Sequence, residues 1–153
     1  MTETARIVDQ LDRAYHGPAW HGPALGEILA GVTAEAAARR PLPGAHNIWE
    51  IVLHIATWEA IVTRRIQGEE IPTLPPDQDW PAARETSEAA WQQALAALAE
   101  AQRALEAEIS AMDDSRLREK VLGERVYQIY TMLHGVVQHN LYHAGQIALL
   151  KKV

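Results

Sequence analysis

Apolar residues recur every three or four positions along most of the chain, a spacing that places them on one face of an α-helix. This pattern predicts a first helix over 4–15, brief helical segments around 25–29 and 33–39, and longer helices over 47–67, from 86 or 87 to 112, and from between 126 and 130 to near the C-terminus. Four main helices favour an all-α fold, namely a four-helix bundle with short extra helices near the N-terminus.

Polar and turn-forming residues mark the ends of these helices. Asn47, followed three residues later by Glu50, has the pattern of a capping box and predicts a helix start. Thr33 is a suitable N-cap for the short segment that follows it. The Pro-rich stretch 69–81 cannot be helical throughout, and we expect it to cross from one end of the fold to the other.

Length and composition agree with this architecture. The chain has 153 residues, of which 48% are apolar, and we expect one domain over 1–153. Alanine and leucine are abundant while β-branched runs are few, which favours helix over sheet. No apolar stretch approaches the roughly 20 residues that span a bilayer, and the acidic N-terminus lacks the features of a signal peptide. We therefore expect a cytoplasmic protein without a membrane partner.

Charge and the absence of cysteine narrow the chemistry further. The formal net charge is −6 and the basic residues are scattered, whereas nucleic-acid binding depends on clustered cations. Nucleic acid is therefore not an expected partner. With no cysteine, the chain forms neither a disulfide nor a thiolate metal site, so histidine becomes the candidate ligand.

Three histidines are candidate metal ligands. His139 and His143 are four residues apart on the last helix, so both imidazoles can reach one ion, and His54 lies among apolar residues on the helix over 47–67. Each also has a plainer interpretation, because such a pair suits a partly wet core and a lone histidine among apolar residues is more often a hydrogen-bonded core residue. Taken together on facing helices, the three predict a divalent-metal site with a coordination position open to water or substrate.

The histidines lie within longer motifs. The last helix contains GVVQHNLYHAGQI over 135–147, and two earlier segments read AWHGP over 19–23 and GAHNIWEIVLH over 44–54. The first motif resembles the C-terminal signature of the DinB/YfiT-like superfamily, and the other two are similar to the segments that lead up to and include that family's first ligand. The resemblance extends over 15–152, although the middle third matches only in pattern.

The resemblance implies a four-helix bundle, often dimeric, in which His54, His139 and His143 hold nickel, zinc, iron or manganese. It also implies a class described as metal-dependent hydrolases, as DNA-damage-inducible proteins of unknown role, or as S-transferases that use low-molecular-weight thiols. The expected partners are therefore a small-molecule substrate, a low-molecular-weight thiol as co-substrate, and a second copy of the chain.

Other residues near the candidate ligands have two interpretations each. Glu50, one turn before His54, is the candidate catalytic base or fourth ligand, although helix capping is the simpler explanation. His46 precedes the N-cap and can position the helix start, while His21 can line the pocket. Glu59 follows His54 by five residues and is expected on a different face.

Residues beside the His139/His143 pair and the tryptophans are less specific signals. Tyr142 and Gln146 either orient a substrate or hydrogen-bond within the bundle. Trp49, Trp58 and Trp91 are expected as anchors of the core or of a dimer interface.

Two enzyme classes and two alternatives remain open. A metal ion lowers the pKa of a bound thiol or water, so thiol transfer and hydrolysis differ only in the nucleophile. Hydrolysis calls for a general base, and Glu50 is a weak candidate, which favours thiol transfer. The alternatives are a non-catalytic metal-binding stress-response module and a structural helical dimer without an ion.

Overall fold

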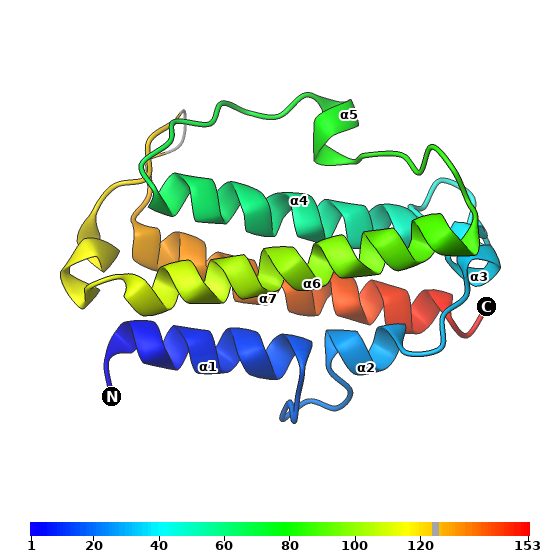
Figure 1. Cartoon of the computed structure of the whole chain (residues 1–153), viewed down its shortest axis with the longest axis horizontal. Coiled ribbons are helices and arrows are strands. Elements are labelled where there is room, and N and C mark those ends of the chain that lie inside the picture. Colours follow the sequence, from blue (N-terminus) through cyan, green and yellow to red (C-terminus); the bar gives the residue numbers. More distant parts are fainter. Residues whose placement is uncertain (124–125) are drawn as a thin grey trace.

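Four helical rods packed side by side make up the fold (Figure 1). The computed structural model describes residues 1–123 and 126–153. Its helices are α1 (Glu3–Tyr15), α2 (Leu25–Leu29), α3 (Ala34–Ala38), α4 (Ile48–Ile66), α5 (Pro76–Asp79), α6 (Glu88–Ala111), the 3-10 helix η1 (Asp114–Arg118) and α7 (Ile129–Leu150). Helices α1 and α4 each pack against α6 and α7, and α2 continues the line of α1. The prediction of an all-α bundle with short extra helices near the N-terminus is confirmed, and the described residues contain no strand.

The predicted helix starts at Thr33, Asn47 and Ser87 are confirmed, and at each of them a side chain satisfies a free backbone N–H group. Thr33 and Ser87 each accept a hydrogen bond from the backbone N–H three residues further on. Asn47 accepts from the Glu50 N–H at 2.8 Å, and the Glu50 carboxylate accepts from the Asn47 N–H at 3.2 Å. The predicted capping box is therefore present.

Two short helices, α5 and η1, lie outside the helical segments that the sequence predicts. Helix α5 begins at Pro76, whose fixed φ suits a first helical turn, and it belongs to the stretch 69–81, which runs between the two ends of the bundle as predicted (Figure 1). In η1, the Asp114 carboxylate accepts from the backbone N–H groups of Glu3 and Thr4 at 2.8 and 3.0 Å. This turn therefore also caps α1.

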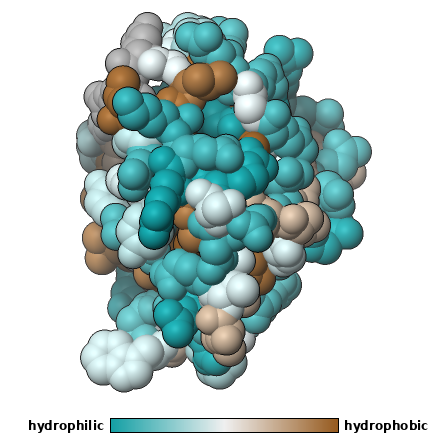
Figure 2. All heavy atoms as spheres, turned by 90° about the vertical axis from the view of Figure 1, so that its left-hand side faces the viewer, coloured by the Kyte–Doolittle hydropathy of each residue, from teal (hydrophilic) through white to brown (hydrophobic). Residues whose placement is uncertain are grey.

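The end of the bundle that carries the N-terminus and η1 presents a mostly hydrophilic surface (Figure 2). On the described part of this face, hydrophobic residues are separated by hydrophilic ones. Isolated apolar residues are normal at a protein surface. Within the described residues, no helix combines the length and apolarity that crossing a bilayer requires.

The interior contains two apolar clusters with a polar layer between them. One cluster is built on α2, α3 and the first half of α4, and the other on α1 and the second half of α4. Three long helices carry buried polar residues between the two clusters: Glu59 lies between Ile55 and Val62, Gln102 between Leu98 and Leu105, and Asn140 and His143 between Val136 and Ala144.

The polar layer is only partly hydrogen-bonded. The Asn140 Nδ2 donates to Glu59 Oε1 at 2.7 Å, and the Gln102 Nε2 donates to Glu106 at 2.6 Å. Burial raises the pKa of Glu59 to about 8, although the hydrogen bond from Asn140 opposes this shift. Among the described residues, Glu59 Oε2 and Gln102 Oε1 have no hydrogen-bond partner. The Glu59 carboxyl is therefore mostly protonated at neutral pH.

Replacing Glu59 by glutamine should remove a pH-dependent loss of stability. The unfolded carboxyl ionises near its ordinary pKa of 4.5, whereas the folded one keeps its proton up to about pH 8. The free energy of unfolding therefore falls as the pH rises between these two values and is constant above them. We expect Glu59→Gln to raise the free energy of unfolding at pH 9 by roughly 1–3 kcal/mol in urea denaturation.

Glu70→Gln, which changes an exposed acid, is the matched control and should keep the pH dependence of the wild type. A stability difference between Glu59→Gln and the wild type that does not grow from pH 5 to pH 9 would contradict the burial argument.

Candidate metal centre

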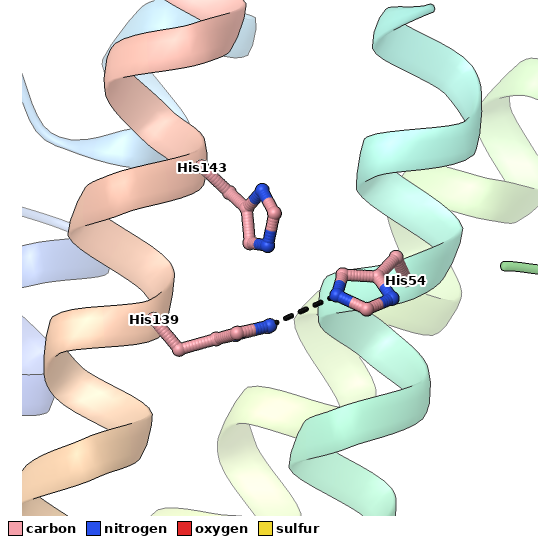
Figure 3. Close-up of side chains that lie close together, drawn as sticks. All are labelled: His54, His139 and His143. Atoms are coloured by element: carbon pink, nitrogen blue, oxygen red, sulfur yellow. Dashed lines mark hydrogen bonds between the residues drawn. The ribbon is translucent and has the colours of Figure 1, made fainter. Parts of the chain in front are cut away.

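The structure brings the three predicted histidines together. His54 comes from α4 and His139 and His143 come from α7, and one ring nitrogen of each lies within 4.8 Å of the others. Figure 3 shows the two α7 side chains pointing across the helix interface toward His54. His54 and His143 are buried and His139 is half-buried. The residues form the cluster that the sequence predicts, and their role as metal ligands stays a prediction.

Hydrogen bonds fix the ring orientation of two of these histidines. The Nδ1 of His54 lies 2.6 Å from the backbone carbonyl oxygen of Asp79, and the Nδ1 of His143 lies 2.6 Å from the side-chain oxygen of Gln146. A carbonyl oxygen only accepts, so Nδ1 carries the hydrogen in both rings. The Nε2 atoms of His54 and His143 are then left with free lone pairs, as a metal ligand requires.

The third histidine is connected to the polar layer of the core. The Nδ1 of His139 lies 3.4 Å from the side-chain oxygen of Asn140, whose amide nitrogen donates to Glu59. Glu59 thus fixes which way the Asn140 amide faces. The sequence predicted Glu59 on a different face from His54. In the structure, however, Glu59 holds Asn140, the hydrogen-bond partner of His139, in position.

All three imidazoles are held in the neutral form that binds metals. Burial lowers the pKa of each ring, and for His139 burial together with the neighbouring His143 and His54 lowers the pKa to about 4. The Nε2 atoms of His139 and His54 lie 3.0 Å apart. At neutral pH at most one hydrogen lies between these two atoms, and a shared cation satisfies both lone pairs equally well. The donor set therefore fits a divalent ion.

An aromatic stack covers the outer side of His54. The Trp80 ring lies parallel to both His46 and His54, with centroid distances of 3.6 and 3.7 Å. Asp79 and Trp80, at the end of α5, are site residues that sequence reasoning missed. They lie 25 and 26 residues after His54 in a segment without periodicity, where no local signal marks them.

Glu50, the candidate base, is held by groups at the start of α4. Its carboxylate accepts hydrogen bonds from Arg40, from the backbone of Asn47 and, at 3.1 Å, faces the Nδ1 of His46. Burial alone would raise the pKa of Glu50, but these hydrogen bonds outweigh burial and lower it. The bond from the Asn47 N–H is the capping interaction, the simpler of the two interpretations, and a catalytic role for Glu50 stays a prediction. His21 is exposed.

The histidines line a cavity of about 740 Å³, a volume typical of small-molecule sites. Most of its wall is apolar or aromatic, and Trp58 and Tyr142 belong to it. Among the described lining residues, Asp79 is the only carboxylate and Arg65 is the only lysine or arginine. The cavity therefore combines a candidate metal site with one acid and one permanent cation.

Alanine at position 54, 139 or 143 should each lower zinc affinity by at least 100-fold, because each removes one of three nitrogen ligands. Calorimetric titration of tag-free protein with zinc measures this effect, and the wild type should bind one ion per chain. His16→Ala, at an exposed histidine after α1, is the control and should bind as the wild type does. Undiminished uptake by any of the three variants would contradict the ligand assignment.

Gln146→Leu should weaken zinc binding by roughly 10- to 100-fold, because His143 loses the acceptor that keeps its Nδ1 hydrogen away from the metal side. The same titration measures the change, with Gln138→Leu, at an exposed glutamine of α7, as the matched control. Equal affinities for the two leucine variants would show that this hydrogen bond does not orient the ring.

Comparisons with known proteins agree with the fold and with the motifs. A crystal structure of a conserved protein from Enterococcus faecalis is similar, with a TM-score of 0.72 and 18% sequence identity over 99% of this chain and 96% of that chain, a level at which the likeness shows the fold alone. No curated protein matches the sequence. The family model of the DinB superfamily matches residues 9–147, a range that contains all three clustered histidines. The chain therefore belongs to the DinB superfamily.

Proposed function

We propose that the chain is a metal-dependent enzyme that binds a small-molecule thiol at the three-histidine site and transfers its sulfur to an electrophile. The observation that carries this proposal is the convergence of three neutral imidazoles, two of them with their Nδ1 hydrogens held by oxygen acceptors, on the wall of a 740 Å³ cavity. Three protein ligands leave a coordination position free, which is the arrangement of reactive rather than structural sites.

The three imidazole donors narrow the choice of metal. Imidazole nitrogens suit zinc, nickel and iron, whereas manganese prefers oxygen ligands. We therefore propose zinc, nickel or iron as the resident ion. When bound, such an ion supplies Lewis acidity and lowers the pKa of a coordinated thiol or water.

The chain's own groups suit a thiol better than a water molecule. In thiol transfer the S–H proton passes to solvent, the sulfur forms a bond to an electrophilic carbon, and the leaving group departs with the bonding electrons. No protein base is needed, because a thiol is far more acidic than water. The apolar and aromatic cavity wall, with Trp58 and Trp80 beside His54, limits access of competing water.

Hydrolysis is the second candidate, and Asp79 is the observation that favours it. Asp79 is the one carboxylate among the described residues of the cavity wall and can act as general base toward a water molecule. However, its Oδ1 already accepts a hydrogen bond from Trp58 Nε1 at 2.8 Å and lies 3.4 Å from His54 Nδ1. These contacts give Asp79 a positioning role as well.

Two substrate panels and one variant separate these functions. We expect zinc- or nickel-loaded protein to conjugate cysteine, glutathione or 2-mercaptoethanol to an electrophilic dye, and His143→Ala to lose this activity. Asp79→Asn, which keeps an oxygen acceptor for Trp58, should change the conjugation rate by less than about 5-fold. In a second panel of ester and amide substrates, a 100-fold or larger loss in Asp79→Asn would favour hydrolysis instead.

Asp77→Asn, at an exposed acid in the same helical turn, is the matched control for both panels. Metal binding without turnover in either panel would overturn the proposal of an enzyme and leave a metal-binding module.

A further inference from the structure

Arg65 lies on the same face of α4 as His54, three turns further along. The two residues are eleven positions apart, close to a whole number of helical turns. Long side chains on a helix lean toward its N-terminus, and the Arg65 guanidinium carbon lies 5.7 Å from the centroid of the Trp58 ring. The guanidinium thus extends along the cavity wall toward the histidines.

The positive charge of Arg65 has no acid to neutralise it among the described residues. Its two terminal nitrogens donate to neutral oxygens, the Tyr127 hydroxyl at 2.8 Å and the Ile71 carbonyl at 3.2 Å. Its Nε atom is buried without a hydrogen-bond partner in the described part of the chain. The adjacent Arg64 is exposed and pairs with Glu69 in the usual way.

These contacts explain only part of what Arg65 does. The bonds to Tyr127 and Ile71 hold the segments after α4 and before α7 against the bundle. A neutral hydrogen-bond donor would do the same, so these bonds do not explain the positive charge. A half-buried guanidinium without a counter-charge is costly, and two of its terminal N–H groups stay free after these bonds. A planar fork of N–H donors matches a carboxylate group.

Arg65 and the histidines face one cavity at a distance that a small molecule can span. The centroid of the Trp58 ring lies 6.3 Å from that of the His139 ring and 5.7 Å from the Arg65 guanidinium carbon. The His139 ring and the Arg65 guanidinium are therefore at most about 12 Å apart. We propose that Arg65 binds a carboxylate of the thiol substrate whose sulfur lies at the three histidines. This inference rests on the proposed function and adds the substrate class, a small thiol carboxylic acid.

The test compares acids with their neutral amides in binding titrations. Zinc-loaded protein is titrated calorimetrically with 3-mercaptopropionate, 6-mercaptohexanoate and 8-mercaptooctanoate and with the corresponding amides. For at least one chain length we expect the acid to bind about 10- to 100-fold more tightly than the amide. Arg65→Gln should abolish this preference by weakening the acid alone, and Arg64→Gln should keep it.

Two further variants separate charge from structure. Arg65→Lys keeps the charge but not the planar fork and should keep a smaller preference. Tyr127→Phe removes one contact of Arg65 but not its charge and should keep the full preference. Equal binding of acid and amide by the wild type, or a preference that survives in Arg65→Gln, would overturn the inference.

A metal-free arm separates this inference from the proposed function. Octanoate and octanamide contain no thiol, so an Arg65-dependent preference for octanoate in metal-free protein supports the carboxylate site by itself. If neither the mercapto acids nor their amides bind the zinc-loaded protein, the proposed function fails, while the metal-free titration still decides the role of Arg65. If the thiol amides bind and no acid is preferred, only the carboxylate site fails.

Discussion

The candidate site depends on which ring nitrogen of each imidazole carries the hydrogen. A buried neutral histidine presents Nε2 to a common centre only when an acceptor holds its other nitrogen. The acceptors here come from different sources: the backbone of α5 for His54, and side chains of α7 for the other two rings. The crossing segment before α6 is therefore part of the candidate site, because its carbonyl at Asp79 orients His54, the candidate ligand from α4.

The same requirement links the site to the core of the bundle. Asn140 directs its oxygen toward His139 and its amide nitrogen to Glu59, so its orientation is set from inside the polar layer. Burying the Glu59 carboxyl costs stability at neutral pH, because its raised pKa makes the folded chain keep a proton that the unfolded chain releases. A leucine there would join the two apolar clusters but would leave the Asn140 amide unsatisfied. The polar layer thus exchanges some stability for a fixed contact between α4 and α7.

Local signals predicted the fold and the three clustered histidines, whereas the groups that orient these histidines depend on distant contacts. The capping pair Asn47 and Glu50 and the four-residue spacing of the last two histidines are visible within single helices. Glu59 looks like any acid on a helix until α7, 81 residues away, places Asn140 against it. The positions of Asp79 and Trp80 likewise depend on the path of a Pro-rich segment, which periodicity does not determine.

Trp58 shows how the parts of the cavity are coupled. The sequence favoured a core or interface role for this residue, but its indole forms part of the cavity wall and contacts both Asp79 and Arg65. Its Nε1 donates to Asp79, beside His54, while its ring face contacts the Arg65 guanidinium. A tryptophan provides both contacts because it combines a donor at its edge with a negative ring face. The indole therefore fixes Asp79, near the histidines, relative to Arg65, which lies farther along α4. One end of the cavity thus carries the histidines and an acid and the other end a cation, an arrangement that matches a ligand with different groups at its two ends.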